Sequence, residues 1–416
     1  MPDPHGAGIV VVGSSLAGLR ACETLRQEGY DGRLTLVGEE PETPYDRPPL
    51  SKKLLAGEWE TERILLRKPT EFESLALDLR LGSRATALDL TSRAVVLADG
   101  TALPFDGVVI ATGASPKRLP GQPDVPGVVT LRRLRDSLAL RERLQPRHRL
   151  VVIGAGFIGL EVAATARQRR CEVTVLEGLP APLVRGLGAE MGTAVAAVHA
   201  RHGVDVQCGV QVTGIEVDGD VVRGVHLGAG GFVEADTVLV GVGVSPETGW
   251  LDGSGLTLRD GVVCDAFLNA GAPGVYAAGD LARWPNGIFV DAEGRPEEMR
   301  IEHWTNAAEQ GAAAARNLLA DLRGEEPVPF ESVPFFWSDQ FESRLQFVGR
   351  AHGDDEVHVF AGDPAAGPFA ALYGWEGRLR GVLGVSSPKQ VMPFRSLVAA
   401  RASWGDALAK AGELAG

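Results

Sequence analysis

Hydrophobic residues in two stretches of the chain follow the same order of strand, turn, helix and strand. The stretches are residues 8–37 and 150–177. In each, a short apolar run leads into a glycine-containing turn, and apolar residues at helical spacing and a second β-rich run come next. Strands that alternate with helices in this way predict parallel sheets. Because the unit occurs twice, each time over about the length of a domain, we predict an α/β protein with two nucleotide-binding domains.

The turn of the second unit carries three glycines, in the order Gly154-Ala155-Gly156-Phe157-Ile158-Gly159. Glycines at these spacings allow a tight turn, a close approach of the backbone to a pyrophosphate, and close packing of helix on strand. The free N–H groups at the start of the following helix would then hold the phosphates. Glu177, about 20 residues further on, ends the next strand and is placed to bond the ribose hydroxyls. The sequence therefore predicts a Rossmann-like dinucleotide site that includes Gly154, Gly156, Phe157, Ile158, Gly159 and Glu177.

The turn of the first unit keeps two of the three glycines. Gly13 and Gly18 are present, and Ser15 stands where the second glycine would be, with Leu16 after it. Serine is small enough for a phosphate to approach the backbone. Glu39 follows the second strand and suits a ribose hydroxyl pair, although a solvated loop carboxylate is the alternative interpretation. We predict a second dinucleotide site here.

Four further segments carry candidate site residues. Residues 44–57, PYDRPPLSKKLLAG, form a proline-rich loop before a helical pattern, and their cations are either surface charges or cofactor contacts. One predicted buried strand ends at Ala111-Thr112-Gly113, and another ends near Gly243. A short apolar strand ends at Gly279-Asp280, and the aspartate would either cap a helix or contact a ligand. The candidates from these segments are Arg47, Lys52, Ala111, Thr112, Gly113, Gly243, Gly279 and Asp280.

The rest of the chain completes the predicted domains. Short β-like runs precede the end of each unit, and an alanine-rich helix is expected over residues 301–320. After a charged, proline-bearing linker come short strands with turn signals and a final helical stretch near Val391. We predict a discontinuous first nucleotide-binding domain of residues 1–115 and 246–325, a second of residues 116–245, and a small α+β C-terminal domain of residues 326–416.

Composition narrows the choice of partners. The 416 residues are 44% hydrophobic and 23% charged, as in globular proteins in water, and the net charge of −13 argues against nucleic acid as a partner. No apolar run approaches the roughly 18–20 residues of a membrane span. The N-terminal residues MPDPHGAG lack the basic region and apolar core of a signal peptide. We therefore expect a cytoplasmic protein that does not bind a membrane.

The four cysteines are scattered. Cys22, Cys171, Cys208 and Cys264 form no CxxC pair and no metal-ligand spacing. A buried thiol is the default interpretation of such residues. We expect no metal site and no catalytic cysteine.

Six motifs together carry a family resemblance: PYDRPPLSK, IATGASP, GFIGLE, YAAGD, HWTNAAEQG and FFWSDQ. With the duplicated unit, they resemble the FAD-dependent, NADH-using ferredoxin reductases of bacterial oxygenase systems, the putidaredoxin reductase-like family. The resemblance covers almost the whole chain in the right order. It implies a glutathione reductase-type fold, with FAD in the first nucleotide-binding domain and NADH in the second.

The resemblance also implies roles for particular residues. The FAD contacts would be Gly13, Ser15, Leu16, Gly18, Glu39, Arg47 and Lys52, with Ala85 near the adenine, Arg132, Asp280 on the ribityl chain, and Trp304. The NADH site would use Gly154, Gly156, Gly159, Glu161 and Glu177. Trp337 either borders the flavin ring or packs in the core.

Glu177 bears on the choice of nicotinamide cofactor. A carboxylate there bonds the ribose diol and repels a 2′-phosphate, so we predict NADH over NADPH. Arg185 and the arginines at 167, 169 and 170 could offset this, but they are expected on a solvated helix face.

Lys52 and Glu161 are the predicted catalytic residues. Glu161 lies just past a helix N-terminus, where the helix dipole alone would favour a carboxylate. The alternative, which the resemblance supports, is that it pairs with Lys52 beside the flavin and orients the nicotinamide. Lys52 would then place positive charge near the reduced flavin.

The position of the cysteines bears on the electron acceptor. Disulfide reductases of this fold have a redox cysteine pair shortly after the first nucleotide unit, and oxidases and peroxidases have a single cysteine; PYDRPPLSKKLL has neither. A one-electron acceptor remains, and an acidic, two-iron two-sulfur ferredoxin that feeds a haem monooxygenase or ring-hydroxylating dioxygenase fits best. Basic residues at Arg47, Lys53, Arg300, Arg344 or Lys389 could steer it.

Other functions stay open at this stage. The alternatives are a rubredoxin- or quinone-directed reductase, an NADH oxidase, which the missing cysteine disfavours, and a redox-responsive interaction flavoprotein resembling apoptosis-inducing factor. We expect a monomer or weak dimer.

Overall fold

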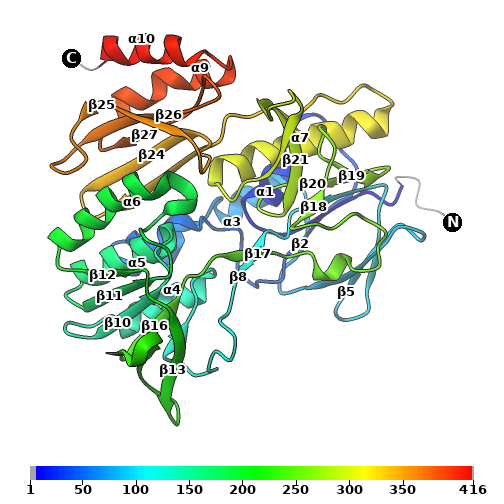
Figure 1. The fold of residues 1–416 in the computed structure, drawn as a ribbon. Helices are drawn as coiled ribbons and strands as arrows, with labels where there is room; N and C mark the ends of the chain where they lie inside the picture. Colours follow the sequence, from blue (N-terminus) through cyan, green and yellow to red (C-terminus); the bar gives the residue numbers. More distant parts are fainter. Residues whose placement is uncertain (1–5, 415–416) are drawn as a thin grey trace. The chain divides into compact units, whose positions relative to one another are not determined.

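The computed structural model describes residues 6–414 and contains two compact units. Unit 1 comprises Met1–Asp46, Ile64–Ser115 and Ser245–Pro334, and unit 2 comprises Arg47–Arg63, Pro116–Val244 and Phe335–Gly416. Figure 1 shows the course of the chain and the labelled elements. The prediction about a signal peptide rests partly on residues 1–5, which lie outside the described residues.

Unit 1 is built on a six-stranded sheet with the strand order β19-β20-β7-β1-β2-β3. The strands from β20 to β3 run parallel, and β19 is antiparallel at the edge. Strands β1, β2 and β7 are buried at every residue, as expected for parallel strands covered on both faces. The bounds are β1 Ile9–Val12, β2 Leu34–Val37, β3 Asp78–Arg80, β7 Gly107–Ile110, β19 Asn269–Ala272 and β20 Val275–Ala277.

Two three-stranded sheets complete the strands of unit 1, in the orders β4-β5-β6 and β18-β21-β22. Their bounds are β4 Ala85–Asp89, β5 Ala94–Leu97, β6 Ala102–Pro104, β18 Val262–Val263, β21 Ala282–Val290 and β22 Pro296–Arg300. The short helical segments of this unit are α3 Pro69–Phe72, η3 Glu73–Leu75 and η5 Gly249–Leu251. Three elements span the points where the chain passes from one unit to the other: η2 Thr61–Ile64, β8 Ala114–Pro116 and β17 Val244–Pro246.

Helices α1 (Leu16–Gln27) and α7 (Trp304–Arg323) lie against each other in unit 1 (Figure 1). Gly311 of α7 faces Ala17 so closely that an added Cβ would overlap the Ala17 carbonyl oxygen. The expected helix over 301–320 therefore forms, but it begins at Trp304. The preceding His303 is extended and serves as the N-cap residue.

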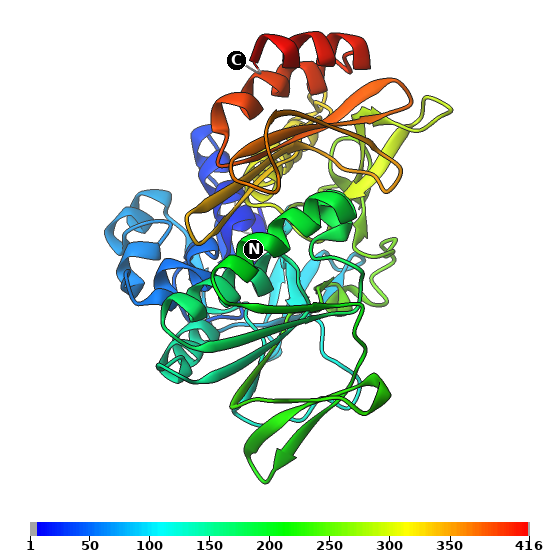
Figure 2. The same ribbon diagram turned by 60° about the vertical axis from the view of Figure 1, so that its left-hand side comes forward.

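Unit 2 contains a five-stranded parallel sheet with the order β12-β11-β10-β16-β9. A three-stranded antiparallel sheet, β13-β14-β15, packs its apolar residues into the same hydrophobic core, and Figure 2 shows it as a projecting green hairpin. The strands are β9 Val128–Val129, β10 Arg149–Ile153, β11 Glu172–Glu177, β12 Asp205–Cys208, β13 Val212–Asp218, β14 Val221–Leu227, β15 Phe232–Glu234 and β16 Thr237–Val240. The helices are η1 Pro48–Ser51, α2 Lys53–Ala56, α4 Leu134–Arg143, α5 Phe157–Gln168, α6 Val184–Arg201 and η4 Gly228–Gly230.

Helix α6 is broken near its start. Gly188 has φ 78° and ψ 167°, which no helix residue adopts, so the first turn is set apart from the rest. The Leu187 carbonyl at the break accepts a hydrogen bond of 2.8 Å from the hydroxyl of Tyr373, a buried residue of the C-terminal sheet. The side chain of Tyr373 thus satisfies a carbonyl oxygen that the break would otherwise leave without a partner.

The C-terminal part of unit 2 is an antiparallel sheet with the order β23-β24-β27-β26-β25, followed by short helices. This agrees with the predicted run of short strands and a final helical stretch. The bounds are β23 Phe335–Gln340, β24 Ser343–Gly349, β25 Glu356–Gly362, β26 Phe369–Trp375, β27 Arg378–Val385, α8 Pro388–Val391, η6 Met392–Phe394, α9 Arg395–Ala399 and α10 Trp404–Leu414.

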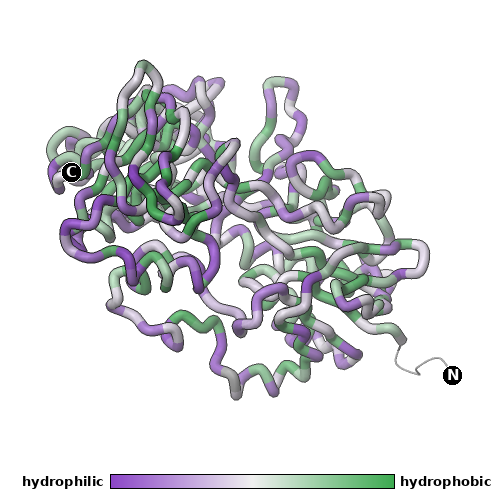
Figure 3. Tube along the Cα trace, turned by 90° about the horizontal axis from the view of Figure 1, so that it is seen from below, coloured by the Kyte–Doolittle hydropathy of each residue, from purple (hydrophilic) through white to green (hydrophobic). Residues whose placement is uncertain are grey.

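Hydrophobic residues are spread over the chain in short runs, which alternate with hydrophilic ones along the trace in Figure 3. Among the described residues, no helix is both long enough and apolar enough to span a membrane.

The contact between α1 and α7 can be tested by replacing Gly311 with alanine. The new methyl group would push α7 away from the Ala17 backbone, so we expect unfolding at lower temperature, with a loss of about 1–3 kcal/mol. Gly412→Ala in α10 is the matched control, because a Cβ there meets nothing within 4 Å and alanine favours a helix by about 0.5–1 kcal/mol. Thermal unfolding by circular dichroism measures both; an unchanged midpoint for Gly311→Ala would contradict the close packing.

Candidate functional site

The glycine turn of unit 2 has the backbone geometry that a dinucleotide needs. Gly154 has φ 100°, and a Cβ there would overlap the Gly241 carbonyl oxygen, while a Cβ at Gly159 would overlap the Gly154 carbonyl oxygen. At Gly156 a Cβ would meet nothing within 4 Å. Two glycines are thus required by packing within the protein, and the third leaves open space before the N-terminus of α5, where a pyrophosphate would lie.

Glu177 lies at the end of β11 and faces this turn. One of its carboxylate oxygens accepts the Ala155 N–H at 2.8 Å, and the other accepts the Leu179 N–H at 2.9 Å. The backbone therefore fixes the carboxylate beside the glycine turn. Each carboxylate oxygen can accept a further bond, which a ribose hydroxyl can supply.

The turn of unit 1 uses its two glycines in the same way. Gly13 has φ 119° and a Cβ there would overlap the Ala111 carbonyl oxygen; a Cβ at Gly18 would overlap that of Gly13. Ser15 is the extended N-cap residue of α1, and Leu16 is the first residue of that helix. Serine therefore takes the position at which the backbone must come near a phosphate.

A buried donor near Gly279 also fits a bound group in unit 1. Gln310 of α7 is fully buried and accepts the Gly279 N–H through Oε1 at 2.8 Å. Its amide nitrogen has no hydrogen-bond partner among the described residues. Burying an unsatisfied donor is costly, so a ligand acceptor in this place would be favoured. The residues present thus fit a dinucleotide cofactor such as FAD.

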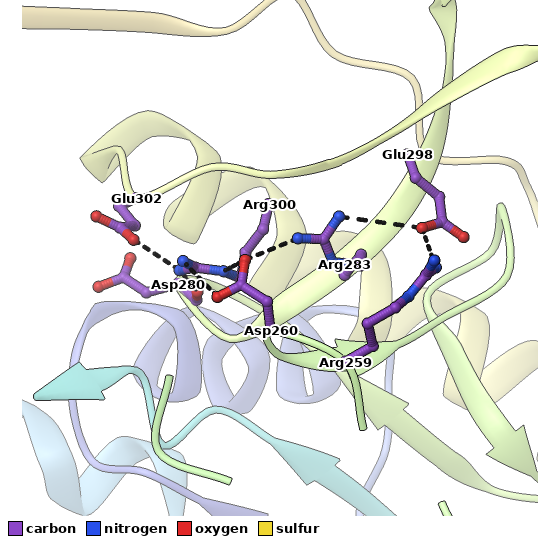
Figure 4. A network of polar contacts seen from close by, with 7 residues as sticks. All are labelled: Arg259, Asp260, Asp280, Arg283, Glu298, Arg300 and Glu302. Atoms are coloured by element: carbon purple, nitrogen blue, oxygen red, sulfur yellow. Dashed lines mark hydrogen bonds and ion pairs between the residues drawn. The ribbon is translucent and has the colours of Figure 1, made fainter. Parts of the chain in front are cut away.

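A cluster of charged residues holds the loop that carries Asp280 (Figure 4). Arg300 donates to the Asp280 carbonyl at 2.8 Å and pairs with Glu302 at 2.7 Å and Asp260 at 3.3 Å. Burial alone would lower the pKa of Arg300, but the bonds to these carboxylates outweigh it and raise that pKa. Arg283 extends the cluster through its own pair with Asp260. The cluster thus fixes the backbone at Asp280.

The other predicted FAD contacts of unit 1 differ in their burial and in their hydrogen-bond partners. Trp304 donates its indole N–H to Asp46 at 2.7 Å. The Thr112 hydroxyl, between Ala111 and Gly113 after β7, donates to the Glu247 carbonyl at 2.7 Å. Ala85 is buried in β4, whereas the Glu39 side chain is about half exposed and lies 4.0 Å from Arg84.

The segment of residues 47–63 belongs to unit 2 and contains two of the predicted FAD contacts, Arg47 and Lys52. Arg47 donates to the Arg132 carbonyl at 2.6 Å, which brings together two predicted FAD contacts. Arg169, the C-cap residue of α5, donates to the Leu55 and Leu144 carbonyls at 2.9 and 3.0 Å. The expectation that Arg169 lies on a solvated helix face is therefore wrong: it fastens this segment to α5.

Lys52 and Glu161 form a buried ion pair. Lys52 Nζ lies 2.7 Å from Glu161 Oε2, and the side chains are 15% and 6% exposed. Ser51 Oγ donates to the same carboxylate oxygen at 2.5 Å, and Ser338 Oγ donates to Oε1 at 2.6 Å. Removing one member of a buried ion pair leaves an uncompensated charge. The Glu161 carboxylate therefore needs these donors to remain buried.

Three more predicted residues lie in unit 2. Phe157 packs edge-on against Phe336, with ring centroids 4.7 Å apart, and Ile158 is 41% exposed. Trp337 of β23 is half-buried, with Arg344 over its ring at 5.9 Å. Gly243 follows β16 with φ 102° and open space at its Cβ position.

None of the four cysteines has the character of a redox thiol. Cys22, Cys171 and Cys264 are buried, and Cys208 is half-buried. Burial raises the pKa of Cys171 to about 11 and that of Cys264 to about 12, and it raises the pKa of Cys22 and Cys208 as well. A thiolate is the reactive form, so these side chains stay inert near neutral pH.

The surface cations expected to steer a partner differ in accessibility. Lys53, Arg344 and Lys389 are exposed. Arg300 was expected among these steering cations, and that expectation is wrong. Its side chain is only 10% exposed and already pairs with carboxylates.

The protein families that match this chain agree with the dinucleotide-binding geometry described above. A family model described as "Pyridine nucleotide-disulphide oxidoreductase" matches residues 7–311, and one described as "Reductase C-terminal" matches residues 335–412. The chain belongs to the pyridine nucleotide-disulphide oxidoreductase family. This confirms the predicted α/β fold class with a small C-terminal domain. The predicted cofactors, FAD and NADH, are those that membership implies.

Individual relatives of this oxidoreductase match along nearly its whole length. Rhodocoxin reductase of Rhodococcus erythropolis is 37% identical over 392 residues, which cover 94% of this chain and 89% of that one. The biphenyl dioxygenase system ferredoxin--NAD(+) reductase component of Paraburkholderia xenovorans (strain LB400) is 36% identical, with coverages of 95% and 94%. The reductase in the crystal structure of the covalent putidaredoxin reductase–putidaredoxin complex superposes with a TM-score of 0.89 at 32% identity and 98% coverage of both chains. The predicted resemblance to putidaredoxin reductase-like proteins is thereby confirmed.

Sequence reasoning missed four polar residues, which are Gln310 in unit 1 and Ser51, Ser338 and Gln340 in unit 2. Their signal was present but weak. Ser338 and Gln340 are polar residues two apart in the apolar segment FFWSDQ, which places both on one face of β23. Their partners are far away in the sequence, so spacing alone could not identify them.

The open space at Gly156 predicts a variant that binds the cofactor less well without losing thermal stability. Gly156→Ala adds a methyl group where the pyrophosphate would lie, so we expect the KM for NADH to rise about tenfold or more while the melting temperature stays the same. Its φ of −77° is allowed for alanine.

Gly159→Ala is the matched control, because its methyl group would overlap the Gly154 carbonyl and lower thermal stability. Steady-state kinetics and thermal unfolding of both variants test this. An unchanged KM in a stable Gly156→Ala protein would contradict a pyrophosphate at this turn.

Proposed function

We propose that this protein is a flavoprotein reductase that takes a hydride from NADH onto FAD and passes electrons singly to an iron–sulfur ferredoxin. The central observation is that two dinucleotide-type turns and a buried Lys52–Glu161 pair occur in a chain whose cysteines are inert. The names of relatives support the acceptor. One is a ferredoxin--NAD(+) reductase component of a dioxygenase system, and another was solved as a complex with putidaredoxin.

FAD is assigned to the predicted domain of residues 1–115 with 246–325, and NADH to the predicted domain of residues 116–245. Residues 326–416 form the proposed C-terminal domain. The proposed FAD contacts are Gly13, Ser15, Leu16, Gly18, Glu39, Arg47, Lys52, Ala85, Ala111, Thr112, Gly113, Arg132, Gly279, Asp280, Trp304 and Trp337. The proposed NADH contacts are Gly154, Gly156, Phe157, Ile158, Gly159, Glu161, Glu177 and Gly243.

Bound FAD can accept two electrons as a hydride and release them one at a time, which links NADH to a one-electron acceptor. The protein's own residues supply binding and orientation. The N–H groups at the start of α5 bind the pyrophosphate, and Glu177 binds the ribose diol. Glu161 orients the nicotinamide, and Lys52 brings positive charge that favours added electrons nearby. No protein acid or base is needed.

The partner is proposed to be an acidic ferredoxin of the two-iron two-sulfur type that feeds a haem monooxygenase or a ring-hydroxylating dioxygenase. Exposed cations such as Lys53, Arg344 and Lys389 suit an acidic partner. A cytoplasmic location and a monomeric or weakly dimeric state stay predictions from the sequence.

Anaerobic titration of the FAD-loaded protein tests the proposal. We expect one NADH per FAD to bleach the flavin absorbance, and added oxidised two-iron ferredoxin to restore it with two ferredoxins reduced per NADH, because each takes one electron. Rubredoxin under the same conditions is the comparison acceptor. Rapid reoxidation by rubredoxin but not by any ferredoxin, or NADH-driven dimerisation without electron transfer, would contradict the proposal.

Glu177 sets the expected preference for NADH over NADPH. Glu177→Gln removes the charge that repels a 2′-phosphate and keeps one carboxamide oxygen, which can accept one of the two backbone N–H groups that Glu177 binds. We expect the ratio of kcat/KM for NADH to that for NADPH to fall about tenfold. Glu190→Gln, an exposed carboxylate on α6, is the control for loss of one charge and should leave the ratio unchanged. A higher kcat/KM of the wild-type protein for NADPH than for NADH would contradict this role of Glu177.

A further inference from the structure

The Glu161 carboxylate is held on both oxygens, by donors from two different parts of unit 2. Lys52 and Ser51 donate to Oε2 from the segment of residues 47–63, and Ser338 donates to Oε1 from β23. Glu161 itself lies on α5. The orientation of the carboxylate is therefore set by a balance between the two sides.

The donor on Oε1 is the end of a longer chain of hydrogen bonds. Gln340 donates its amide N–H to Ser338 Oγ at 3.0 Å, and Gln340 Oε1 lies 2.8 Å from His199 Nε2 on α6. All four residues are buried, and as whole residues Glu161 is 5%, Ser338 1%, and Gln340 and His199 0% exposed. A fully buried chain of this kind is polarised in one direction, and its members strengthen one another.

The direction of the chain follows from its chemistry. Gln340 uses its N–H on Ser338, so its Oε1 must accept, and His199 must carry a proton on Nε2. Burial lowers the pKa of His199 and thereby favours the neutral ring. His199 Nδ1 then has no proton and no partner among the described residues. Its neighbours are the Phe341 ring at 5.2 Å and His202, which bonds the Val198 carbonyl and Glu342.

We infer that Ser338, Gln340 and His199 are positioning residues that hold the Glu161 carboxylate in the orientation needed to align the nicotinamide of NADH for hydride transfer. This inference rests on the proposed function, because it requires NADH to bind beside Glu161. It assigns the C-terminal sheet a part in the reductive half of the reaction.

The physical reason lies in the strength of the competing donors. Without the Ser338 hydroxyl, Oε1 loses the donor that Ser338 supplies, while Lys52 and Ser51 keep their bonds to Oε2. The carboxylate would then rotate towards Lys52. Small misplacements of an orienting group lower the rate of a transfer step far more than they lower affinity.

The first test compares Ser338→Ala with Ser338→Thr in the FAD-loaded protein. Stopped-flow reduction by saturating NADH should slow about tenfold in Ser338→Ala, while calorimetric affinity for NAD+ changes less than twofold. Threonine keeps the hydroxyl and should restore most of the rate. Ser343→Ala on the paired strand β24 is the control and should behave as wild type. An unchanged rate in Ser338→Ala, or loss of rate and affinity together without rescue by threonine, would overturn the inference.

The second test addresses the far end of the chain. His199→Gln can still donate an N–H to Gln340 and should keep the reduction rate, whereas His199→Phe cannot donate and should reduce it about threefold. His202→Gln is the control from the same helix. Equal rates for His199→Phe and wild type would remove His199 from the proposal.

A third measurement does not depend on turnover. Nitrogen NMR of the FAD-loaded protein labelled in histidine should show His199 as the Nε2–H form with an unprotonated Nδ1 at pH 7. A charged ring or the Nδ1–H form would contradict the direction of the chain. This result stands even if NADH does not reduce the wild-type protein, an outcome that would refute the proposed function instead.

Discussion

The rest of the site depends on one buried carboxylate. A charge at 6% exposure needs compensation, and Glu161 receives it from Lys52 and Ser51 on one side and from Ser338 on the other. These donors are more than 100 residues away along the chain on each side. Satisfying this single group therefore brings a proline-rich segment, a nucleotide-binding helix and a strand of the C-terminal sheet to one point.

Local chemistry explains why so much of the fold could be predicted. Gly18 and Gly159 are required by contacts with a glycine five residues earlier, whereas Gly13 and Gly154 meet carbonyls that follow an adjacent strand. The spacing of the glycines within one turn was nevertheless enough to predict both sites. The buried strands likewise show themselves as unbroken apolar runs. The Lys52–Glu161 pair was predicted through family resemblance, because spacing alone does not bring these residues together.

The parts that could not be predicted depend on contacts between distant segments. Arg169 and Arg300 were expected on the surface, since sequence does not reveal that carbonyls and carboxylates from elsewhere surround them. The polar side chains of Ser338 and Gln340 are unremarkable in a strand until their partners are known. Helix α7 begins three residues later than expected, since Ile301 to His303 lie outside the helix and His303 is its extended N-cap residue.

The break in α6 has a consequence for exchanging parts between related enzymes. A chimera joined in the linker before Phe335 would keep both glycine turns, and it would look complete by its nucleotide motifs. It would nevertheless replace Tyr373, whose hydroxyl donates to the Leu187 carbonyl in this protein. Successful transplants would therefore need a donor sheet with a hydroxyl at that position, so the C-terminal sheet and the nucleotide-binding helices are compatible only as a matched set.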